Sequence, residues 1–304
     1  IVENGLQVLE NMTHRCAESA DNKTGDGAGI MLQIPHEFIL LQGIPVPEKG
    51  LYGTGLVFLP KDAIEAEIYM VALTDTVEKE GLKLLAVRDV PVNSDILGEI
   101  SKQNEPQIKQ IFIVGEGLSQ DELELKLYLL RKKIEKAVLH STLKDKRNAY
   151  IVSLSTKRIV YKGMLTSLQL RHYFPDLLNP HFTSGIALVH SRFSTNTFPT
   201  WDLAQPFRLV GHNGAFNTIR GNRLWMEARE SILKSEALGN MNDIWPIVQF
   251  GMSDSASFDN VLEFLVMSGK SLPHALAMMV PESWNSKNPI SSDLKAFYEY
   301  HSIF

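Results

Sequence analysis

Cysteine is almost absent from this sequence. Its 304 residues contain one, Cys16, so no intrachain disulfide can form. No apolar run approaches the roughly eighteen residues of a membrane-spanning helix. The first residues also lack the basic segment and cleavage pattern of a secretory signal. Together these absences predict a protein of the reducing cytosol, with a cytoplasmic location.

A strong charge of either sign is lacking as well. The net charge is -5, and acidic and basic residues are interspersed. Nucleic acids and anionic membranes call for a basic face, so neither is expected as a partner. The nine histidines show no metal-ligand spacing, so no metal site is predicted. With 44% apolar and 21% charged residues, the chain can build a sizeable globular core.

The apolar pattern predicts an irregular alternation of helices and short strands. Helices are expected over 1–13, 61–80, 120–140, 222–237 and 258–268. Strands are expected over 30–34, 51–60, 83–90, 148–154, 158–163 and 184–190. Ser119 and Glu122 form a capping box before the longest helix. This arrangement favours an α+β fold over a doubly wound sheet. Uncapped Ile1 and the aromatic run before Phe304 are expected to be cut edges of something longer.

The segment 191–222 is dense in Asn, Gly, Thr, Arg and Pro, a composition typical of loops that carry chemistry. The strand that leads into it places His190, Arg192 and Ser194 on one face by two-residue alternation. An arginine at a strand end suits bidentate recognition of a carboxylate. A surface salt bridge explains Arg192 equally well, so both interpretations stay open.

Two further polar segments offer groups for acyl transfer. FRLVGHNG is predicted as a strand that enters a turn, where the Asn213 amide and the Gly214 N–H could hold an oxyanion. Taken alone, an ordinary Asn-Gly hairpin turn is the favoured interpretation. Asp254 could accept hydrogen bonds from a ligand ammonium group. Taken alone, a helix start with Ser255 or Ser257 as N-cap is favoured there.

Other patterns are set aside. The glycine-rich loop TGDGAG at 24–29 is neither a P-loop nor a G-x-G-x-x-G dinucleotide fingerprint, and no lysine follows it. A calcium loop built on Asp21 and Asp26 lacks its closing glutamate. A reactive pair of His14 and Cys16 is disfavoured, because neighbouring positions at a helix end point in different directions.

Taken in order, four motifs are far more specific than any one of them. They are THRCAESADNKTGDGAG, HSRFSTNTFPTW, LAQPFRLVGHNGAFNTIRGN and SDSAS. They resemble the amidotransferase domain of the glutamate synthase large chain, which is a class II glutamine amidotransferase. The resemblance runs from Val2 to Phe304 and predicts a single, incomplete domain over 1–304. It implies the amino-terminal-nucleophile hydrolase fold, a four-layer α/β/β/α sandwich of two antiparallel sheets.

The resemblance also implies a chemistry. The thiolate of an amino-terminal cysteine attacks the side-chain amide of L-glutamine, and the α-amine of that cysteine is the base. Glutamate and ammonia are released, and the ammonia aminates 2-oxoglutarate at a distant flavin site. Carried onto this sequence, Arg192 binds the glutamine α-carboxylate with Thr195 beside it. Asp254 binds the α-ammonium group, and Asn213 and Gly214 form the oxyanion hole.

The sequence departs from the family where the nucleophile belongs. The mature family chain opens with Cys-Gly and a short strand before the helix that starts here at Ile1. This segment by itself is therefore expected to be inactive. Cys16 stands where the family usually has glycine, but it is internal and has no free amine. If the backbone there needs φ > 0, a cysteine is strained by about 1 kcal/mol or more.

The resemblance further implies cofactors and partners that lie outside this segment. FMN and an iron–sulfur cluster are expected in the full-length enzyme and neither in this segment. The expected partners are L-glutamine, the remainder of the large chain, and an electron-donating subunit or ferredoxin. The sequence does not distinguish NADPH, NADH and ferredoxin as the electron donor, and it predicts no oligomeric state.

Two other functions compete with glutamine hydrolysis. A nucleophile-free module that binds glutamine and signals or scaffolds would use the same pocket residues, Arg192, Asn213, Gly214 and Asp254. A different class II amidotransferase, making asparagine or a phosphoribosylamine, is disfavoured. The TGDGAG loop and the long block from LAQPFR to NTIRGN argue against it.

Overall fold

The computed structural model describes most of the chain. The described residues are 1–19, 21, 23–192, 198–214, 216, 219–249 and 251–302. They form two compact units, Ile1–Asn213 and Gly214–Phe304, which are described separately. The expectation of a single domain over 1–304 stays a prediction.

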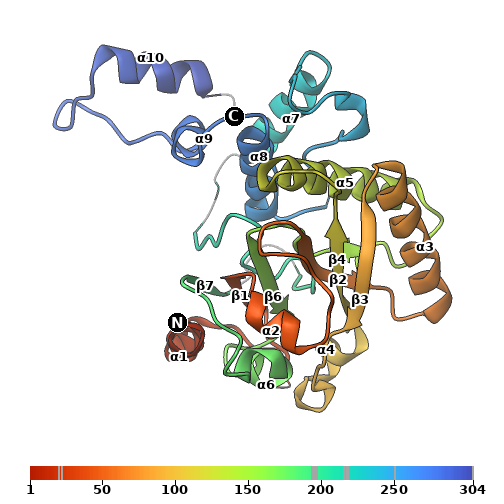
Figure 1. Cartoon of the computed structure of the whole chain (residues 1–304). Helices are drawn as coiled ribbons and strands as arrows, with labels where there is room; N and C mark the ends of the chain where they lie inside the picture. Colours follow the sequence, from red (N-terminus) through yellow and green to blue (C-terminus); the bar gives the residue numbers. More distant parts are fainter. Residues whose placement is uncertain are drawn as a thin grey trace. The chain divides into compact units, whose positions relative to one another are not determined.

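The first unit is built on two antiparallel sheets (Figure 1). In the three-stranded sheet, β1 (Ala28–Gln33) lies between β6 (Arg158–Gly163) and β7 (Ala187–Ser191). The four-stranded sheet has the order β3-β4-β2-β5, and its strands are β2 (Gly53–Leu59), β3 (Lys83–Asp89), β4 (Gln107–Val114) and β5 (Tyr150–Ile151). Every pairing is antiparallel, which confirms the predicted α+β fold with two antiparallel sheets.

Two long helices, α3 (Ala63–Lys79) and α5 (Gln120–His140), cover one face of the four-stranded sheet. The alternation of side chains along β2 explains this packing. Val57 and Leu59 join the core with the two helices, whereas Leu56 points into the other core of the unit. Burying this apolar face stabilises both helices far more than helix propensity does.

Helix α5 begins and ends where the sequence predicts. Ser119 Oγ accepts the backbone N–H of Glu122 at 3.4 Å. The Glu122 carboxylate accepts the backbone N–H of Ser119 at 2.9 Å. Both bonds satisfy donors that a bare helix start would leave unpaired, so the capping box is confirmed.

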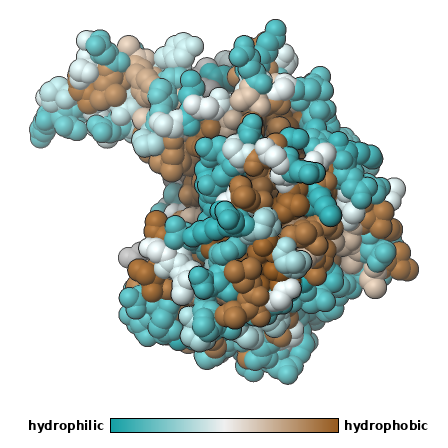
Figure 2. Space-filling view, in the orientation of Figure 1, coloured by the Kyte–Doolittle hydropathy of each residue, from teal (hydrophilic) through white to brown (hydrophobic). Residues whose placement is uncertain are grey.

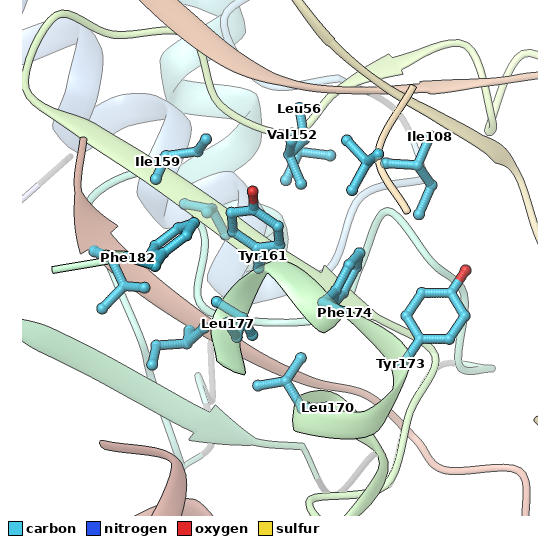
Figure 3. Close-up of a cluster of buried hydrophobic side chains, with 14 of the residues drawn as sticks. Leu56, Ile108, Val152, Ile159, Tyr161, Leu170, Tyr173, Phe174, Leu177 and Phe182 are labelled. Atoms are coloured by element: carbon cyan, nitrogen blue, oxygen red, sulfur yellow. The ribbon is translucent and has the colours of Figure 1, made fainter. Parts of the chain in front are cut away.

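The other core is shared by the two sheets and by α1 (Val2–Asn11). Figure 3 shows Leu56 of β2 and Tyr161 of β6 in one cluster with Phe174 and Phe182. The Tyr161 ring packs edge-on against both phenylalanine rings, with centroids 5.1 and 5.5 Å apart. The layers are therefore α3 and α5, the four-stranded sheet, the three-stranded sheet and α1, in the predicted sandwich order.

Several short elements of the first unit were not predicted. They are α2 (His36–Leu41), α4 (Glu99–Gln103), α6 (Gln169–Tyr173), strand β4, and the 3-10 helices Thr13–Arg15, Ser94–Ile96 and Pro175–Leu178. The prediction of a strand in FRLVGHNG is wrong. The N–H of Phe207 donates to the carbonyl of Val210 at 2.8 Å, so the chain turns there instead of extending.

The described part of the second unit is helical. It contains α7 (Ile219–Glu230), α8 (Asp254–Met267), α9 (Leu272–Met279), α10 (Ser292–His301) and the 3-10 helix Met241–Asp243. Helix α7 ends at Glu230, seven residues before the predicted end of the helix expected over 222–237. Helix α8 begins at Asp254, four residues before the predicted start of the helix expected over 258–268. Trp284 stacks on Tyr298 with centroids 5.8 Å apart, which ties α10 to the segment before it.

The surface has a mixed character. Hydrophilic residues are spread over the face shown in Figure 2, with hydrophobic residues between them. Among the described residues, no helix is both long enough and apolar enough to cross a membrane.

Candidate active site

Arg192 directly follows strand β7. Its backbone N–H donates to the carbonyl of Gly27 at 2.8 Å, which extends the pairing of β7 with β1 beyond Ser191. The Arg192 side chain is buried, with 6% of its surface exposed. Its predicted place at a strand end is confirmed. Arg192 is therefore not a surface residue, and its role in binding a carboxylate stays a prediction.

His190 shares a face of β7 with Arg192 and reaches a loop far along the chain. Its Nε2 atom lies 2.9 Å from the backbone oxygen of His212. A carbonyl only accepts, so Nε2 is the donor. Burial lowers the pKa of His190 to about 4; the bond to His212 opposes this shift, while the charges of His212 and Arg192 add to it. The ring is therefore neutral at neutral pH.

The backbone of His212 is held from its other side as well. Its N–H donates to Gln205 Oε1 at 2.8 Å. The residue before Asn213 is thus fixed through both its N–H and its carbonyl group. A backbone held in this way gives the following side chain a defined starting direction.

The glycine-rich loop explains how Gln205 comes so close to the sheet. A Cβ atom added to Gly29 would lie 2.5 Å from the backbone oxygen of Gln205. One added to Gly27 would lie 3.0 Å from Ala204 Cβ, and Gly27 has a φ of 135°, which side chains disfavour. The glycines of this loop therefore admit the 204–205 segment against β1.

Asp21 anchors the turn that precedes these glycines. Its carboxylate accepts the Thr24 hydroxyl at 2.6 Å and the backbone N–H of Thr24 at 2.7 Å. It also accepts the backbone N–H groups of Lys23 at 3.0 Å and Glu99 at 3.2 Å. These bonds, the Thr24 hydroxyl first, lower the pKa of Asp21 to about 2. Within the described ranges, no group of three or more His, Cys, Asp or Glu side chains could hold a metal ion.

Asn213 and Gly214 lie on either side of the boundary between the two units. Both residues are exposed, and Gly214 has a φ of 153°, a conformation that glycine adopts more easily than other residues. The residues 198–213 before them contain no strand, so the hairpin-turn interpretation is wrong.

In the second unit, Asp254 is the first residue of α8. Ser253 is the N-cap, because its Oγ accepts the backbone N–H of Ala256 at 3.2 Å. The expected helix start is confirmed, but Ser255 and Ser257 are not the cap. Asp254 Oδ1 accepts the N–H of Ser255 at 2.6 Å, and the side chain is half-buried at the positive end of the helix dipole.

Arg223 of α7 holds the start of α8 in the same unit. Its Nη2 donates to the carbonyl of Met252 at 2.7 Å and to Ser257 Oγ at 2.9 Å. Beside it lies a cavity of about 190 Å³ whose lining includes Phe216 and Phe258. Sequence patterns gave no sign of this arginine's role, because the contact joins two helices that are separated by residues 231–253.

Comparison with known sequences decides the family. A sequence model of the family described as Glutamine amidotransferases class-II matches residues 1–304. The chain belongs to this family. The predicted resemblance is confirmed.

The relatives of this amidotransferase are glutamate synthases. Glutamate synthase (NADH) of Schizosaccharomyces pombe is 45% identical over 99% of this chain and 15% of its own length. The Glutamate synthase (NADPH) large chains of Azospirillum brasilense and Bacillus subtilis are 41% and 42% identical, each over 99% of this chain and 20% of its own length. The chain therefore spans a fifth or less of the length of these relatives.

The structure distributes the expected site residues of the amidotransferase over both units. Arg192 and Asn213 belong to the first unit, and Gly214 and Asp254 to the second. Thr195 lies outside the described residues. The roles of all five in glutamine binding and catalysis stay predictions. Gln205 was missed as a supporting residue, although it stands inside the LAQPFR block that carries the resemblance.

Cys16 of the amidotransferase packs against strand β7. Its backbone is extended, with φ -83° and ψ 151°, so the strain expected for a positive φ does not arise. Its Sγ lies 2.5 Å from the hydroxyl oxygens of both Ser167 and Ser191. This half-buried thiol is thus enclosed by hydroxyl groups on the strand that leads to Arg192.

Proposed function

We propose that this chain is the ammonia-producing part of a glutamate synthase. It hydrolyses L-glutamine to glutamate and ammonia, and the ammonia serves the reductive amination of 2-oxoglutarate. One observation carries the proposal: within one unit, buried Arg192 directly follows strand β7, and His190 of that strand holds the residue before Asn213. A cation for a carboxylate and an amide for an oxyanion are what hydrolysis of glutamine requires.

The proposed reaction proceeds through a thioester. The thiolate of the family's amino-terminal cysteine, which is not among these residues, adds to the side-chain amide carbon of glutamine. The carbonyl electron pair moves to oxygen, and the Asn213 amide and the Gly214 N–H donate to that oxyanion. The cysteine α-amine has taken up the thiol proton, and this α-ammonium group passes the proton to the leaving nitrogen as the carbon–nitrogen bond breaks and ammonia leaves. Water cleaves the thioester and restores the thiol.

The other end of glutamine needs two charges. In the proposal Arg192 binds the α-carboxylate with Thr195 beside it, and Asp254 binds the α-ammonium group. Both ends of the substrate would then be fixed before the thiolate attacks, which lowers the entropic part of the barrier. Cys16 takes no part as a nucleophile, because an internal cysteine has no free α-amine to act as its base.

The redox part of the proposal lies outside this sequence. Iron–sulfur clusters are held by cysteine thiolates, as a rule about four. This sequence has one cysteine, so the cluster and FMN are proposed for the remainder of a longer large chain. The names of the relatives specify NADH, NADPH or ferredoxin, so this segment does not fix the electron donor or the donating partner. A cytoplasmic location is part of the same proposal.

A second candidate, a glutamine-binding module without a nucleophile, uses the same Arg192 and Asn213. Intact mass and terminal sequencing of the natural protein, together with an assay of ammonia release from glutamine, distinguish the two. A processed Cys-Gly terminus with glutamine-dependent ammonia release supports hydrolysis. A natural chain that starts at Ile1, binds glutamine in calorimetry and releases no ammonia overturns hydrolysis. The 304-residue polypeptide alone is expected to bind glutamine without hydrolysing it.

A further inference from the structure

We propose that His190 is a positioning residue for the Asn213 amide, acting through its hydrogen bond to the carbonyl oxygen of His212. The inference rests on the proposed glutaminase function, because it gives Asn213 the role of an oxyanion donor. It adds a residue to which the resemblance assigns no role. His190 touches neither the substrate nor the nucleophile in this proposal; it fixes the group that does.

The backbone of His190 is held by sheet pairing. His190 lies opposite Gly29 in the pairing of β7 with β1, the central strand of its sheet. The donor Nε2 therefore starts from a backbone held on a paired strand, and its bond to His212 measures 2.9 Å. The second hydrogen bond to the His212 backbone, from its N–H to Gln205 Oε1, measures 2.8 Å.

The two bonds act on the peptide groups on either side of His212. The carbonyl held by His190 belongs to the peptide bond that enters Asn213, so its orientation sets the first backbone angle of that residue. No strand holds the described residues 198–213, so sheet pairing cannot do this. Side-chain bonds from His190 and Gln205 take the place of a strand partner.

The surroundings of the His190 ring indicate that the hydrogen bond from Nε2 to the His212 carbonyl is its main contribution. His190 is 8% exposed, and its Nδ1 atom has no hydrogen-bond partner among the residues that the structure describes. A buried polar atom without a partner costs stability, so an apolar side chain of similar volume would fill the space at least as well. The only contribution of histidine that such a side chain lacks is the Nε2 donor.

The same geometry excludes proton transfer by His190. Its Nε2 proton is committed to the His212 carbonyl, and its Nδ1 is buried away from solvent. Burial also lowers its pKa to about 4, so the ring carries no charge between pH 6 and 9. A variant at this position should therefore change the height of the pH–rate profile and not its shape.

The expected effect is a loss of turnover with little loss of affinity. Removing an oxyanion donor costs about a hundredfold to a thousandfold in kcat, and misplacing one by about 1 Å can cost about a hundredfold. His190→Met, which keeps the volume without the donor, should lower kcat by about tenfold to a hundredfold. The KM for glutamine should stay within about threefold, because Arg192 is untouched.

The test is a double-mutant cycle in the natural full-length protein, with glutamine hydrolysis as the readout. Asn213→Ala is expected to lower kcat by roughly a hundredfold or more. If His190 acts through Asn213, adding His190→Met to Asn213→Ala should change kcat by less than about twofold. His190→Gln, whose amide can donate to the same carbonyl, should recover kcat to within about threefold of the wild type. His181→Met, at an exposed histidine of the same unit, is the matched control and should leave kcat unchanged.

The outcomes separate two failures. Near wild-type turnover of Asn213→Ala would overturn the oxyanion assignment, and this inference with it. The second failure would be a large loss of kcat in Asn213→Ala together with an equal effect of His190→Met on kcat in the wild-type and Asn213→Ala proteins. That result would overturn the positioning role alone. If His190→Met does not fold, Gln205→Met removes the opposite bond to His212 and provides the same cycle. Independent effects of Gln205→Met and Asn213→Ala would then overturn it.

Discussion

The carboxylate of Glu124 accepts a hydrogen bond from the hydroxyl of Ser155 at 2.7 Å, inside the protein. The same carboxylate accepts the backbone N–H of Thr156 at 2.6 Å and its hydroxyl at 2.7 Å. Arg158 supplies a cation at 3.4 Å. Helix α5 is thereby tied to the chain between β5 and β6, which leads into the three-stranded sheet.

Replacing this carboxylate should destabilise the fold. Glu124→Ala leaves the buried donors of Ser155 and Thr156 without this acceptor, so the free energy of unfolding should fall by about 1–3 kcal/mol or more. Denaturant unfolding followed by circular dichroism measures it. Glu67→Ala, at an exposed position of α3, is the control and should change stability by less than about 0.5 kcal/mol. Equal effects of the two variants would show that the Glu124 network contributes nothing of its own.

Arg192→Lys should weaken glutamine binding more than it slows the reaction. Lysine keeps the charge but loses the planar pair of donors that a carboxylate prefers. A charge-assisted bond contributes about 1.5–3 kcal/mol, so KM should rise by about tenfold to a hundredfold. Steady-state kinetics of ammonia release give both constants. The matched control is Arg147→Lys, at a half-exposed arginine. A wild-type KM in Arg192→Lys would remove Arg192 from the substrate site.

Asp21 should make stability depend on pH in the acid range. Its pKa in the folded protein is about 2, below the value of 3.8 for a free side chain. A lowered carboxylate pKa stabilises the folded state above the unfolded value, and this contribution is lost as the pH falls toward 2. Thermal unfolding of the wild type and Asp21→Asn should therefore differ most above pH 4 and converge toward pH 2. Asp75→Asn, at an exposed site of α3, should show no such convergence.

Gly29→Ala should disturb the segment that carries Gln205. The new Cβ would lie 2.5 Å from the Gln205 backbone oxygen, so the segment must move away from β1. Overpacking of this kind costs about 1–3 kcal/mol, and the shift should also lower glutaminase turnover. Unfolding and kinetics are measured together. Gly221→Ala, in α7 with open space around its Cβ position, should be neutral or stabilising by up to about 1 kcal/mol. Unchanged turnover in Gly29→Ala would show that the site tolerates movement of this segment.

Elements with a complete local signal were predicted well. The capping box at Ser119 and the apolar stripe behind it fixed α5 at 120–140, and β6 was predicted at its observed bounds. Strand β4 was missed for the opposite reason. Its run IFIV is buried on both faces of the sheet, and a short continuous apolar run has no period that separates a strand from a helix.

The apolar pair at Leu209 and Val210 shows how local pattern can mislead. The sequence around it predicts a strand, but the bond from Phe207 to Val210 closes a turn instead. The β propensity of such residues depends on neighbouring strands, and the described residues 198–213 form no strand here. The same loop holds Asn213, so the error lies beside a candidate functional residue.

The sequence by itself determined the family, the antiparallel α+β fold and the residue types of the site. These follow from motif order, apolar period and caps, all of which are local properties of the chain. Only the tertiary structure decided that His190 reaches the carbonyl of His212, 22 residues away, and that Gly29 admits Gln205 against the sheet. Such contacts depend on how distant segments pack, because a hydrogen bond requires atoms about 3 Å apart and no sequence spacing encodes that distance.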